Sequence, residues 1–292
     1  MNLLAGILEN KSLAPHNWYR VGGTARYYAK PISVDELKDL TDWAHQEQLP
    51  VFLLGRGANV LFADAGFDGL VIHTKSLVKK PYVLESGLIE VEVGQDLEKL
   101  IGWSNRHGYQ GLEGFVGIPS TMGGAVWGNA GAADGGIGKL VSEVQLIEPG
   151  GALEWIDGRD LAWDYRYSGI QDRVIARVRL ELTPGFDAEN LQKRSDDLLQ
   201  KKKDTQPFEN KTCGCVFRNP DGMSAGQLIE DCQLKGRTSG GAMISNKHAN
   251  FIENVTGKAS SHDIEVLIEL IQETVREKYG VSLKNEVVMP GS

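Results

Sequence analysis

Residues 111–132 read GLEGFVGIPSTMGGAVWGNAGA, and they constrain the fold more than any other stretch of the chain. Seven of these 22 residues are glycine, and no charged side chain follows Glu113. A glycine inside a helix or strand costs about 0.5–1 kcal/mol relative to alanine, so we expect a loop here. Backbone N–H groups in such a loop form concavities that bind anions. The stretch therefore predicts either the binding of a large phosphate-bearing ligand or a tightly packed turn region between two strands.

The composition is that of a soluble globular protein. The chain has 292 residues, enough for two or three packed units, and is 41% hydrophobic and 24% charged. The formal net charge of −8 argues against sequence-independent binding of nucleic acid, which needs a basic face. It still allows local basic pockets for phosphates.

No segment indicates export or membrane insertion. Residues 1–11 contain an apolar run that no basic residue precedes and that Glu9 follows, so they are a poor signal peptide and too short to cross a bilayer. The three cysteines, Cys213, Cys215 and Cys232, are too few for a disulfide framework and indicate a reducing compartment. We expect a cytoplasmic protein that binds neither nucleic acid nor membrane.

Hydrophobic periodicity predicts alternating helices and strands. A short helix is expected at the N-terminus, and Ser33 and Glu36 form a capping box for a helix that extends to about Gln48. A helix followed by a strand that ends in glycines indicates an α/β unit. Further helices are expected over residues 96–107, 187–204, 225–232 and 262–279, and strands over 25–29, 51–54, 69–74, 88–93, 144–147 and 174–182. The lysine run at 201–203 is predicted to be a solvated helix end.

The turn at residues 55–59 begins like a dinucleotide-binding fingerprint. Gly55 and Gly57 have the right spacing, but the third glycine is missing and a strand-like segment follows in place of a helix. The Rossmann interpretation therefore fails. A phosphate-binding turn and a plain β-turn both remain, and the Asn59 side chain is expected to hold the turn by bonding its own backbone.

Taken together, eight segments resemble one flavoenzyme family, the UDP-N-acetylenolpyruvoylglucosamine reductases, which complete UDP-N-acetylmuramate for peptidoglycan. The segments occur in the family's order and resemble its compact type, which lacks an extra insertion over the substrate. They are YRVGGTA (19–25), LLGRGANVLFAD (53–64), GLEGFVGIPSTMGGAVWGNAGA (111–132), YRYS (165–168), CGCVFRNP (213–220), AGQLIED (225–231), LKGRTSGGAMISNKHANFIEN (234–254) and LKNEV (283–287).

The resemblance implies an α+β fold built from α/β subdomains. Residues 1–75 and 76–186 would be the two subdomains of an FAD-binding domain of the vanillyl-alcohol-oxidase (PCMH) type. Residues 187–292 would be a C-terminal α+β substrate domain. The protein would be a monomer, with FAD as cofactor, NADPH as cosubstrate and no metal.

The same resemblance implies which residues line the cofactor. Arg56, Ala58 and Ser120 depart from the glycine, serine and glycine that are common at these positions, so the pyrophosphate contacts differ here. The expected FAD contacts are Arg20, Gly22, Gly23, Gly55, Arg56, Gly57, Ala58, Asn59, Gly117, Ile118, Pro119, Ser120, Gly123, Gly124, Asn129, Gly131 and Ala132.

In the family, NADPH reduces FAD and leaves, and the enolpyruvyl sugar nucleotide then enters the same cleft. Hydride passes from the reduced flavin to C3 of the enolpyruvyl group, and C2 is protonated. Arg166 matches the arginine that stabilises the developing enolate, an interaction worth about 2.7–4 kcal/mol; its alternative is a structural salt bridge. Glu286 matches the family's essential glutamate, and a carboxyl group beside the substrate carboxylate helps only if it is protonated or shares a proton.

Cys215 stands where the family commonly has a serine that donates the proton to C2. A thiol has an ordinary pKa of about 8.5 and is a stronger acid than a hydroxyl, so Cys215 is predicted to be the donor. Two alternatives are an inert buried cysteine and half of a metal site with Cys213. The spacing does not suit a zinc knuckle, and no second pair of cysteines exists.

The remaining matches imply contacts with the uridine diphosphate sugar. His248 also allows a role as general base, and Tyr165 allows a place in the core. The expected substrate contacts are Tyr165, Arg218, Asn219, Gln227, Lys235, His248 and Asn250. Two rival functions are a different FAD enzyme, such as a sugar or alcohol oxidase, and a non-catalytic binder of flavin or UDP-sugar.

Overall fold

The computed structural model describes residues 6–132 and 135–291. Contacts between α-carbons divide the chain into two compact units. The first unit takes its described residues from Met1–Leu8, Tyr28–Arg56 and Leu70–Lys202. The second takes its described residues from Glu9–Tyr27, Gly57–Gly69 and Lys203–Ser292.

The N-terminal part of the chain forms a four-stranded sheet in the order β1-β2-β4-β3. The strands β3 and β4 are parallel, with Val51 opposite Leu70. The helix α1 (Val34–Gln46) precedes β3 and begins as predicted, because the Ser33 hydroxyl accepts a 3.1 Å hydrogen bond from the Glu36 N–H. The four strands are β1 (Leu8–Ser12), β2 (Thr24–Ala29), β3 (Val51–Leu54) and β4 (Phe67–His73).

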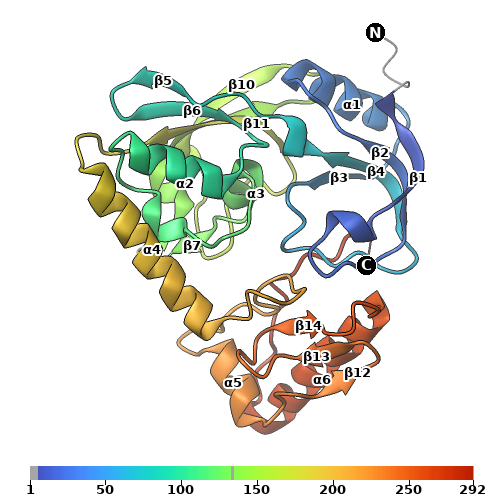
Figure 1. Cartoon of the computed structure of the whole chain (residues 1–292). Helices are drawn as coiled ribbons and strands as arrows, with labels where there is room; N and C mark the ends of the chain where they lie inside the picture. Colours follow the sequence, from blue (N-terminus) through green and yellow to red (C-terminus); the bar gives the residue numbers. More distant parts are fainter. Residues whose placement is uncertain (1–5, 133–134, 292) are drawn as a thin grey trace. The chain divides into compact units, whose positions relative to one another are not determined.

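The first unit is built on an antiparallel sheet in the order β10-β9-β11-β6-β5. The helices α2 (Leu97–Arg106) and α3 (Met122–Trp127) lie on one face of this sheet (Figure 1). In β11 the buried residues Val178 and Leu180 alternate with the partly exposed Arg177 and Arg179, whereas four consecutive residues of β9, Val144–Ile147, are buried. The five strands are β5 (Tyr82–Glu85), β6 (Leu88–Glu92), β9 (Val141–Ile147), β10 (Leu153–Asp157) and β11 (Val174–Glu181).

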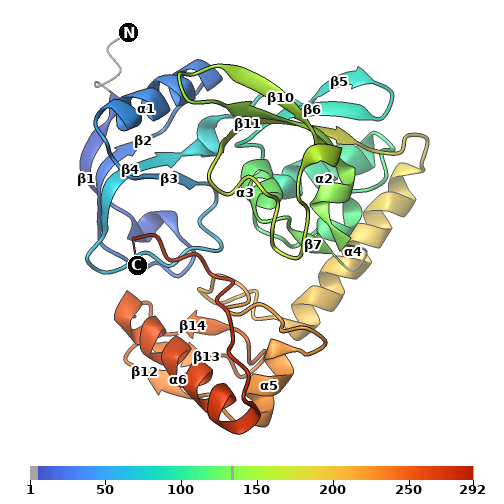
Figure 2. The ribbon, with the colours of Figure 1, turned by 180° about the vertical axis from the view of Figure 1, so that it is seen from behind.

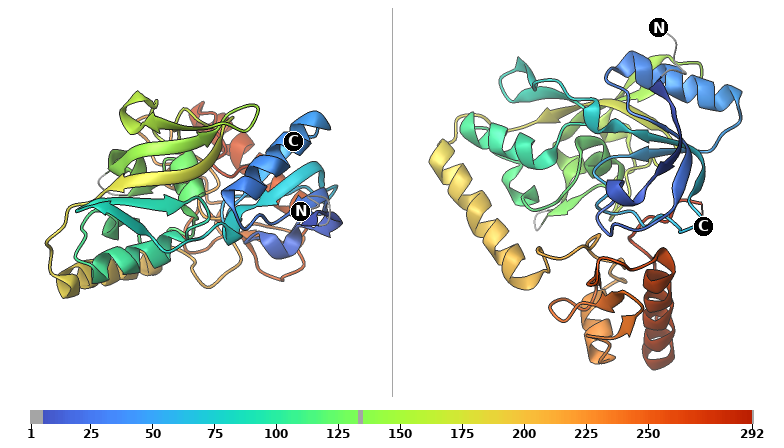
Figure 3. Two further views of the ribbon diagram at one scale, coloured as in Figure 1. Left: turned by 90° about the horizontal axis from the view of Figure 1, so that it is seen from above. Right: turned by 45° about the vertical axis from the view of Figure 1, so that its right-hand side comes forward.

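The helix α4 (Ala188–Thr205) ends the first unit and lies beside α2 (Figures 1 and 3). The amide of Asn105 donates a 2.9 Å hydrogen bond to the hydroxyl of Ser195 between the two helices. A small hairpin of β7 (Gly131–Ala132) and β8 (Gly135–Gly136) follows α3 along the chain.

The second unit combines two helices with a three-stranded antiparallel sheet in the order β12-β13-β14. The long helix α6 lies along this sheet (Figure 2). Phe217, Ile244, Ile252 and Ile271 belong to its buried core. The elements are α5 (Ala225–Asp231), β12 (Thr238–Ser239), β13 (Ala242–Ile244), β14 (Ile252–Asn254) and α6 (Ser261–Tyr279).

Three expectations from the sequence were wrong. Where a helix was expected near the N-terminus, Leu8–Ser12 form the edge strand β1, and Asn10 has φ +50°, which a right-handed helix excludes. The part of this expectation that concerns residues 1–5 lies outside the described residues. The solvated end expected for the lysine run is wrong for Lys202. Its ammonium donates a 2.6 Å hydrogen bond to the Val116 carbonyl, and burial lowers its pKa.

The third wrong expectation concerns the glycine-rich stretch, which is not a loop throughout. Residues Met122–Trp127 form α3, which includes Gly123 and Gly124. A Cβ on Gly123 would lie 2.0 Å from Cγ2 of Val93. Glycine therefore allows the helix to approach the end of β6 more closely than any other residue would.

Candidate active site

Two of the predicted cofactor-binding turns meet in the first unit. A Cβ on Gly55 would lie 2.6 Å from Oγ1 of Thr121, the residue that caps the N-terminus of α3. The turn at Gly55 is therefore in van der Waals contact with the glycine-rich stretch. The sequence predicted both segments but gave no reason for their contact.

The predicted catalytic arginine lies against the same glycine-rich stretch. A Cβ on Gly131 would stand 2.5 Å from Nη1 of Arg166, so only glycine leaves room for the guanidinium in this position. Arg166 has φ +58°, and its guanidinium carbon lies 5.1 Å from the centre of the Tyr165 ring. The Tyr165 side chain is 48% exposed, which excludes the core as its place.

Side-chain bonds fix the loop that carries Arg166. The Asn129 amide donates a 2.8 Å hydrogen bond to the Asp164 carbonyl and accepts one of 3.0 Å from the Gly138 N–H. The hydroxyl of Ser168 donates to the Trp127 carbonyl at the end of α3. Two hydrogen bonds thus join residues 164–168 to the glycine-rich stretch, so the loop that carries Arg166 is preorganised.

The Arg56 guanidinium forms an ion pair with the Asp96 carboxylate at 2.8 Å and lies 3.8 Å from Glu98. The three residues line a cavity of about 570 Å³ together with Lys99, Gly102 and Arg106. The positive charge that distinguishes this turn is therefore balanced by carboxylates of α2 and its cap. An FAD contact of Arg56 stays a prediction.

In the second unit, residues 16–23 lie against the turn at Gly57. Gly57 has φ +66°, and a Cβ there would stand 2.1 Å from the His16 carbonyl oxygen. The Gly57 carbonyl accepts a 2.9 Å hydrogen bond from the Trp18 N–H. Arg20 also has positive φ, and its guanidinium donates to the Pro15 carbonyl. The segments around Arg20 and Gly57, both predicted to bind FAD, are therefore neighbours.

The structure corrects the role expected for the Asn59 side chain. Its amide donates a 3.0 Å hydrogen bond to the carbonyl of Glu286 instead of closing on its own turn. The Asn59 carbonyl in turn accepts from the N–H of Val288 at 3.0 Å. Asn59, which was expected to contact the cofactor, thus holds the segment of the predicted catalytic residue Glu286.

Backbone hydrogen bonds bring the segments of Cys215 and Glu286 together within the second unit. The N–H of Glu286 donates to the carbonyl of Val216 at 2.7 Å. The N–H of Val216 donates to the carbonyl of Asn250 at 2.9 Å. The segment around Cys215 is therefore held between residues 250–251 and 285–287, next to Glu286.

The cysteines differ in burial. Cys213 is 3% exposed, and burial raises the pKa of its thiol to about 12. Its Sγ lies 3.4 Å from the Val60 carbonyl, so Cys213 fits the inert buried cysteine. Cys215 is only partly buried, and none of the three cysteines forms a disulfide. Within residues 6–132 and 135–291, no group of three His, Cys, Asp or Glu side chains is arranged to hold a metal.

Among the predicted substrate contacts, Asn219, Gln227 and Asn250 lie at the start of α5. The Asn250 amide is buried, with its oxygen 2.9 Å from the Phe217 N–H and its nitrogen 2.8 Å from the Phe217 carbonyl. The Asn219 oxygen accepts from the Ala225 N–H at 3.0 Å. Gln227 bonds Asp231, and Lys235 pairs with Glu230. The Nε of Arg218 is buried with no hydrogen-bond partner in the described part of the chain.

His248 is a neutral acceptor in this arrangement. Its Nδ1 accepts a 3.2 Å hydrogen bond from the Asn250 N–H, and its ring packs on Phe251. Burial and the nearby Lys235 ammonium lower its pKa. The side chain is therefore suited to hydrogen bonding from its Nε2–H.

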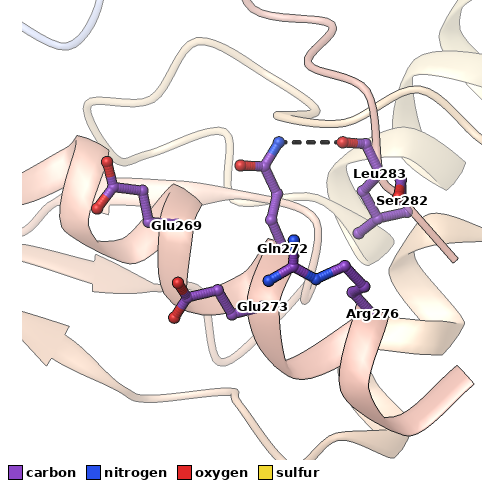
Figure 4. Close-up of a pocket in the computed structure, with 6 residues that line it drawn as sticks. All are labelled: Glu269, Gln272, Glu273, Arg276, Ser282 and Leu283. Carbon is purple, nitrogen blue, oxygen red and sulfur yellow. Dashed lines mark hydrogen bonds between the residues drawn. The ribbon is translucent and has the colours of Figure 1, made fainter. Parts of the chain in front are cut away.

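One residue beside this site, Gln272, had no signal in the sequence. Gln272 of α6 donates to the Leu283 carbonyl and to the side chain of Asn285, next to Glu286 (Figure 4). It lines a surface cavity of about 320 Å³ with Glu269, Glu273, Arg276, Ser282 and Leu283, which contains none of the predicted site residues. Arg166 belongs to the first unit, and Cys215 and Glu286 belong to the second.

Comparison with known proteins covers nearly the whole chain. Residues 25–157 match the model of an FAD binding domain, and residues 206–290 match the C-terminal domain of UDP-N-acetylenolpyruvoylglucosamine reductase. A protein of that name from Synechocystis is 40% identical over 98% of this chain and 91% of its own length. Another from Synechococcus elongatus is 39% identical over 100% of this chain and 97% of its own length.

A solved structure also resembles the chain over nearly its whole length. The crystal structure of UDP-N-acetylenolpyruvylglucosamine reductase from Thermus caldophilus superposes with a TM-score of 0.82. It is 32% identical and covers 97% of this chain and 98% of its own. Among the described helices, none is long and apolar enough to cross a membrane.

Proposed function

Because the chain belongs to the UDP-N-acetylenolpyruvoylglucosamine reductase family, a family of FAD-dependent oxidoreductases, we propose that it reduces the enolpyruvyl group of UDP-N-acetylenolpyruvoylglucosamine with NADPH. The product is UDP-N-acetylmuramate for peptidoglycan. The observation that carries the proposal is the hydrogen bond from the Glu286 N–H to the carbonyl of Val216, the residue that follows Cys215. This bond holds the segments of the two proposed catalytic residues together. An FAD oxidase of another substrate has no need of this arrangement.

The residues present fit an FAD. The Gly55 turn contacts Thr121 of the glycine-rich stretch, and Gly57 contacts the segment that carries Arg20. Gly55 and Gly57 belong to the same turn, residues 55–59, in which only Arg56 has a charged side chain. The other residues of the turn would meet a pyrophosphate with backbone groups and uncharged side chains. The FAD ligands are the set expected from the sequence, from Arg20 to Ala132. When bound, FAD supplies the hydride chemistry, accepting from NADPH and giving to C3 of the enolpyruvyl group.

Arg166 stabilises the negative charge that develops on the substrate as C3 gains the hydride. Its planar guanidinium binds a carboxylate at two points and stays charged at any working pH. Contact with Gly131 and the tethered loop at 164–168 support this role, because a preorganised cation needs no rearrangement during the reaction.

Cys215 donates its thiol proton to C2 and is left as a thiolate. Its partial burial supports the role, since the donor must reach the substrate while Cys213 is shielded. Glu286 hydrogen-bonds the substrate carboxylate through a shared proton. The bonds from Asn59 and to Val216 hold its peptide in place.

The diphosphate and uridine are held in the second unit. The buried Nε of Arg218 supports this, because an anionic group would satisfy it. His248, Asn250 and Asn219 position the nucleotide by hydrogen bonds, as do Gln227 and Lys235, and Tyr165 is a further substrate contact. We also propose a cytoplasmic monomer with FAD-binding subdomains at residues 1–75 and 76–186 and a substrate domain at 187–292.

The visible spectrum of the purified protein tests the function. Under anaerobic conditions, NADPH should bleach the flavin band, and UDP-N-acetylenolpyruvoylglucosamine should restore it in one turnover. A band that NADPH bleaches but the enolpyruvyl substrate does not restore would contradict the proposal. A yellow protein that does not react with NADPH would favour a non-catalytic binder.

A further inference from the structure

Gln272 connects α6 to the segment that carries Glu286. Its Nε2 donates a 3.0 Å hydrogen bond to the Leu283 carbonyl and lies 3.2 Å from the side-chain oxygen of Asn285. Figure 4 shows the first of these bonds, with the Gln272 amide directed at Leu283. Both acceptors belong to residues that closely precede Glu286 in the chain. The Gln272 side chain therefore restrains the backbone just before the glutamate.

The Glu286 peptide is held on its other sides by separate groups. Its N–H donates to the Val216 carbonyl at 2.7 Å, and its carbonyl accepts from the Asn59 amide at 3.0 Å. Asn285 itself is bridged to Phe217. Of these restraints, the Gln272 bonds are the ones that join the segment to a helix. Without Gln272, Leu283 and Asn285 lose these hydrogen bonds to α6.

The helix is a firm support for this contact. Ser260 and Asp263 form a reciprocal capping box at its N-terminus, and Ile268, Ile271 and Val275 are buried in the core of the second unit. Gly280 ends the helix with φ +69°, after which the chain turns back towards Gln272. Leu283 is buried in the same core, and the hydrogen bonds of Gln272 add directional restraints on residues 283–285 to this packing.

We propose that Gln272 is a positioning residue for Glu286, a role that rests on the function proposed above. It touches neither substrate nor cofactor in this role. By holding Leu283 and Asn285 on the rigid helix, it sets where the Glu286 carboxyl group lies relative to the substrate carboxylate. Small displacements of a reacting group cost large factors in rate, up to about 100-fold for 1 Å.

Two substitutions separate this role from packing. Gln272→Met keeps the length and volume of the side chain but removes its donor, and Gln272→Glu keeps a polar group that cannot donate to the Leu283 carbonyl when ionised. Glu273→Gln is the matched control, because Glu273 is the next residue of α6 and is exposed. All variants are purified as the full-length FAD-loaded protein.

The two half-reactions are then measured separately by stopped flow. For Gln272→Met and Gln272→Glu, reoxidation of prereduced enzyme by the enolpyruvyl substrate should slow by about 10- to 100-fold. Flavin reduction by NADPH, substrate affinity of the oxidised enzyme and the thermal unfolding midpoint should match those of Glu273→Gln. Equal slowing of both half-reactions, or wild-type reoxidation in both variants, would overturn the proposal.

A double-mutant cycle with Glu286→Gln tests whether Gln272 acts through the glutamate. The double variant with Gln272→Met should be no slower in reoxidation than Glu286→Gln alone. Multiplying losses would show that Gln272 acts independently and would overturn the positioning role. If Glu286→Gln alone reoxidises at the wild-type rate, the proposed role of Glu286 fails, and the positioning role fails with it.

Discussion

Gly131 leaves room for the Arg166 guanidinium, and this contact gives a prediction at the scale of one residue. In Gly131→Ala the new methyl group would meet Nη1 at 2.5 Å. The guanidinium is the far end of a flexible side chain, so the protein should fold while the charge moves away from its place. We expect kcat for the enolpyruvyl substrate to fall by about 100-fold, the loss typical of a displaced charge-stabilising donor.

Gly128→Ala is the matched control for this variant. Its methyl group would lie 3.4 Å from the Gly124 carbonyl, and it meets no catalytic side chain. Steady-state kinetics and thermal unfolding of Gly131→Ala and Gly128→Ala test whether the contact positions Arg166. Equal kcat values in the two variants would show that the Gly131 contact does not position Arg166.

The sequence identified residues whose chemistry is local to a motif and missed those whose role depends on a distant partner. Arg166, Cys215 and Glu286 each stand in a recognisable segment. The bond between Asn59 and Glu286 joins residues 227 positions apart, and no pattern around Asn59 encodes it. Gln272 sits in an ordinary amphipathic helix, where a polar residue between buried positions indicates only a surface.

At the scale of elements, α3 depends on the absence of a side chain at Gly123. Glycine to alanine ordinarily stabilises a helix by about 1 kcal/mol. Here the methyl group would lie 2.0 Å from Val93 Cγ2, and overpacking of this kind costs about 1–3 kcal/mol. We therefore expect Gly123→Ala to lower stability to chemical denaturation and to weaken flavin retention.

Val93→Ala supplies the control, because it removes the atom that the new methyl group would meet. The double variant should lose less stability than the sum of the two single losses. Additive losses would mean that the close approach of α3 to the end of β6 is not what requires glycine at position 123.

The capping box of α6 makes a pH-dependent contribution to stability. Hydrogen bonds from the backbone N–H groups of Ser260 and Gly241 lower the pKa of Asp263 below its usual value near 3.8. The unfolded chain therefore binds a proton at higher pH than the folded one. The contribution is complete above the unfolded pKa and is lost as pH falls through the folded pKa.

Asp263→Asn removes this titration. Wild type should be more stable at pH 7 by about 0.3–1 kcal/mol, the usual value of a carboxylate in the first turn of a helix, and the difference should shrink below about pH 4. Urea denaturation from pH 7 to pH 3 measures it. Parallel stability curves for the two proteins would contradict the assignment.

Periodic elements were predicted well, and those set by tertiary contacts were not. The apolar spacing of α1, α2 and α6, with the Ser33 cap of α1, gave their ends within two residues, because these signals lie in or next to the helix itself. The strand β1 has exposed side chains over most of its length, so it carries no alternation, and its pairing comes from the rest of the sheet. The helix α3 contains glycines, and the close contact of Gly123 with Val93 at the end of β6 explains the glycine at that position.

At the scale of the molecule, the second unit is assembled from three separate stretches of chain. Glu9–Tyr27 and Gly57–Gly69 group with the C-terminal third, which the sequence treats as a contiguous domain. Hydrogen bonds such as that between Asn254 and the Tyr19 carbonyl are the reason. The turn at Gly57, which is predicted to bind FAD, and the segments of the proposed catalytic residues Cys215 and Glu286 consequently belong to one unit.

The central claim is that this chain reduces an enolpyruvyl group with the proton supplied by Cys215. The most direct measurement is a single turnover of prereduced enzyme with UDP-N-acetylenolpyruvoylglucosamine, followed by flavin reoxidation and product formation in Cys215→Ser and Cys215→Ala. The serine variant should remain active, because a hydroxyl can donate in the same place, whereas the alanine variant should form no UDP-N-acetylmuramate. Product formation by Cys215→Ala at the wild-type rate would contradict the account.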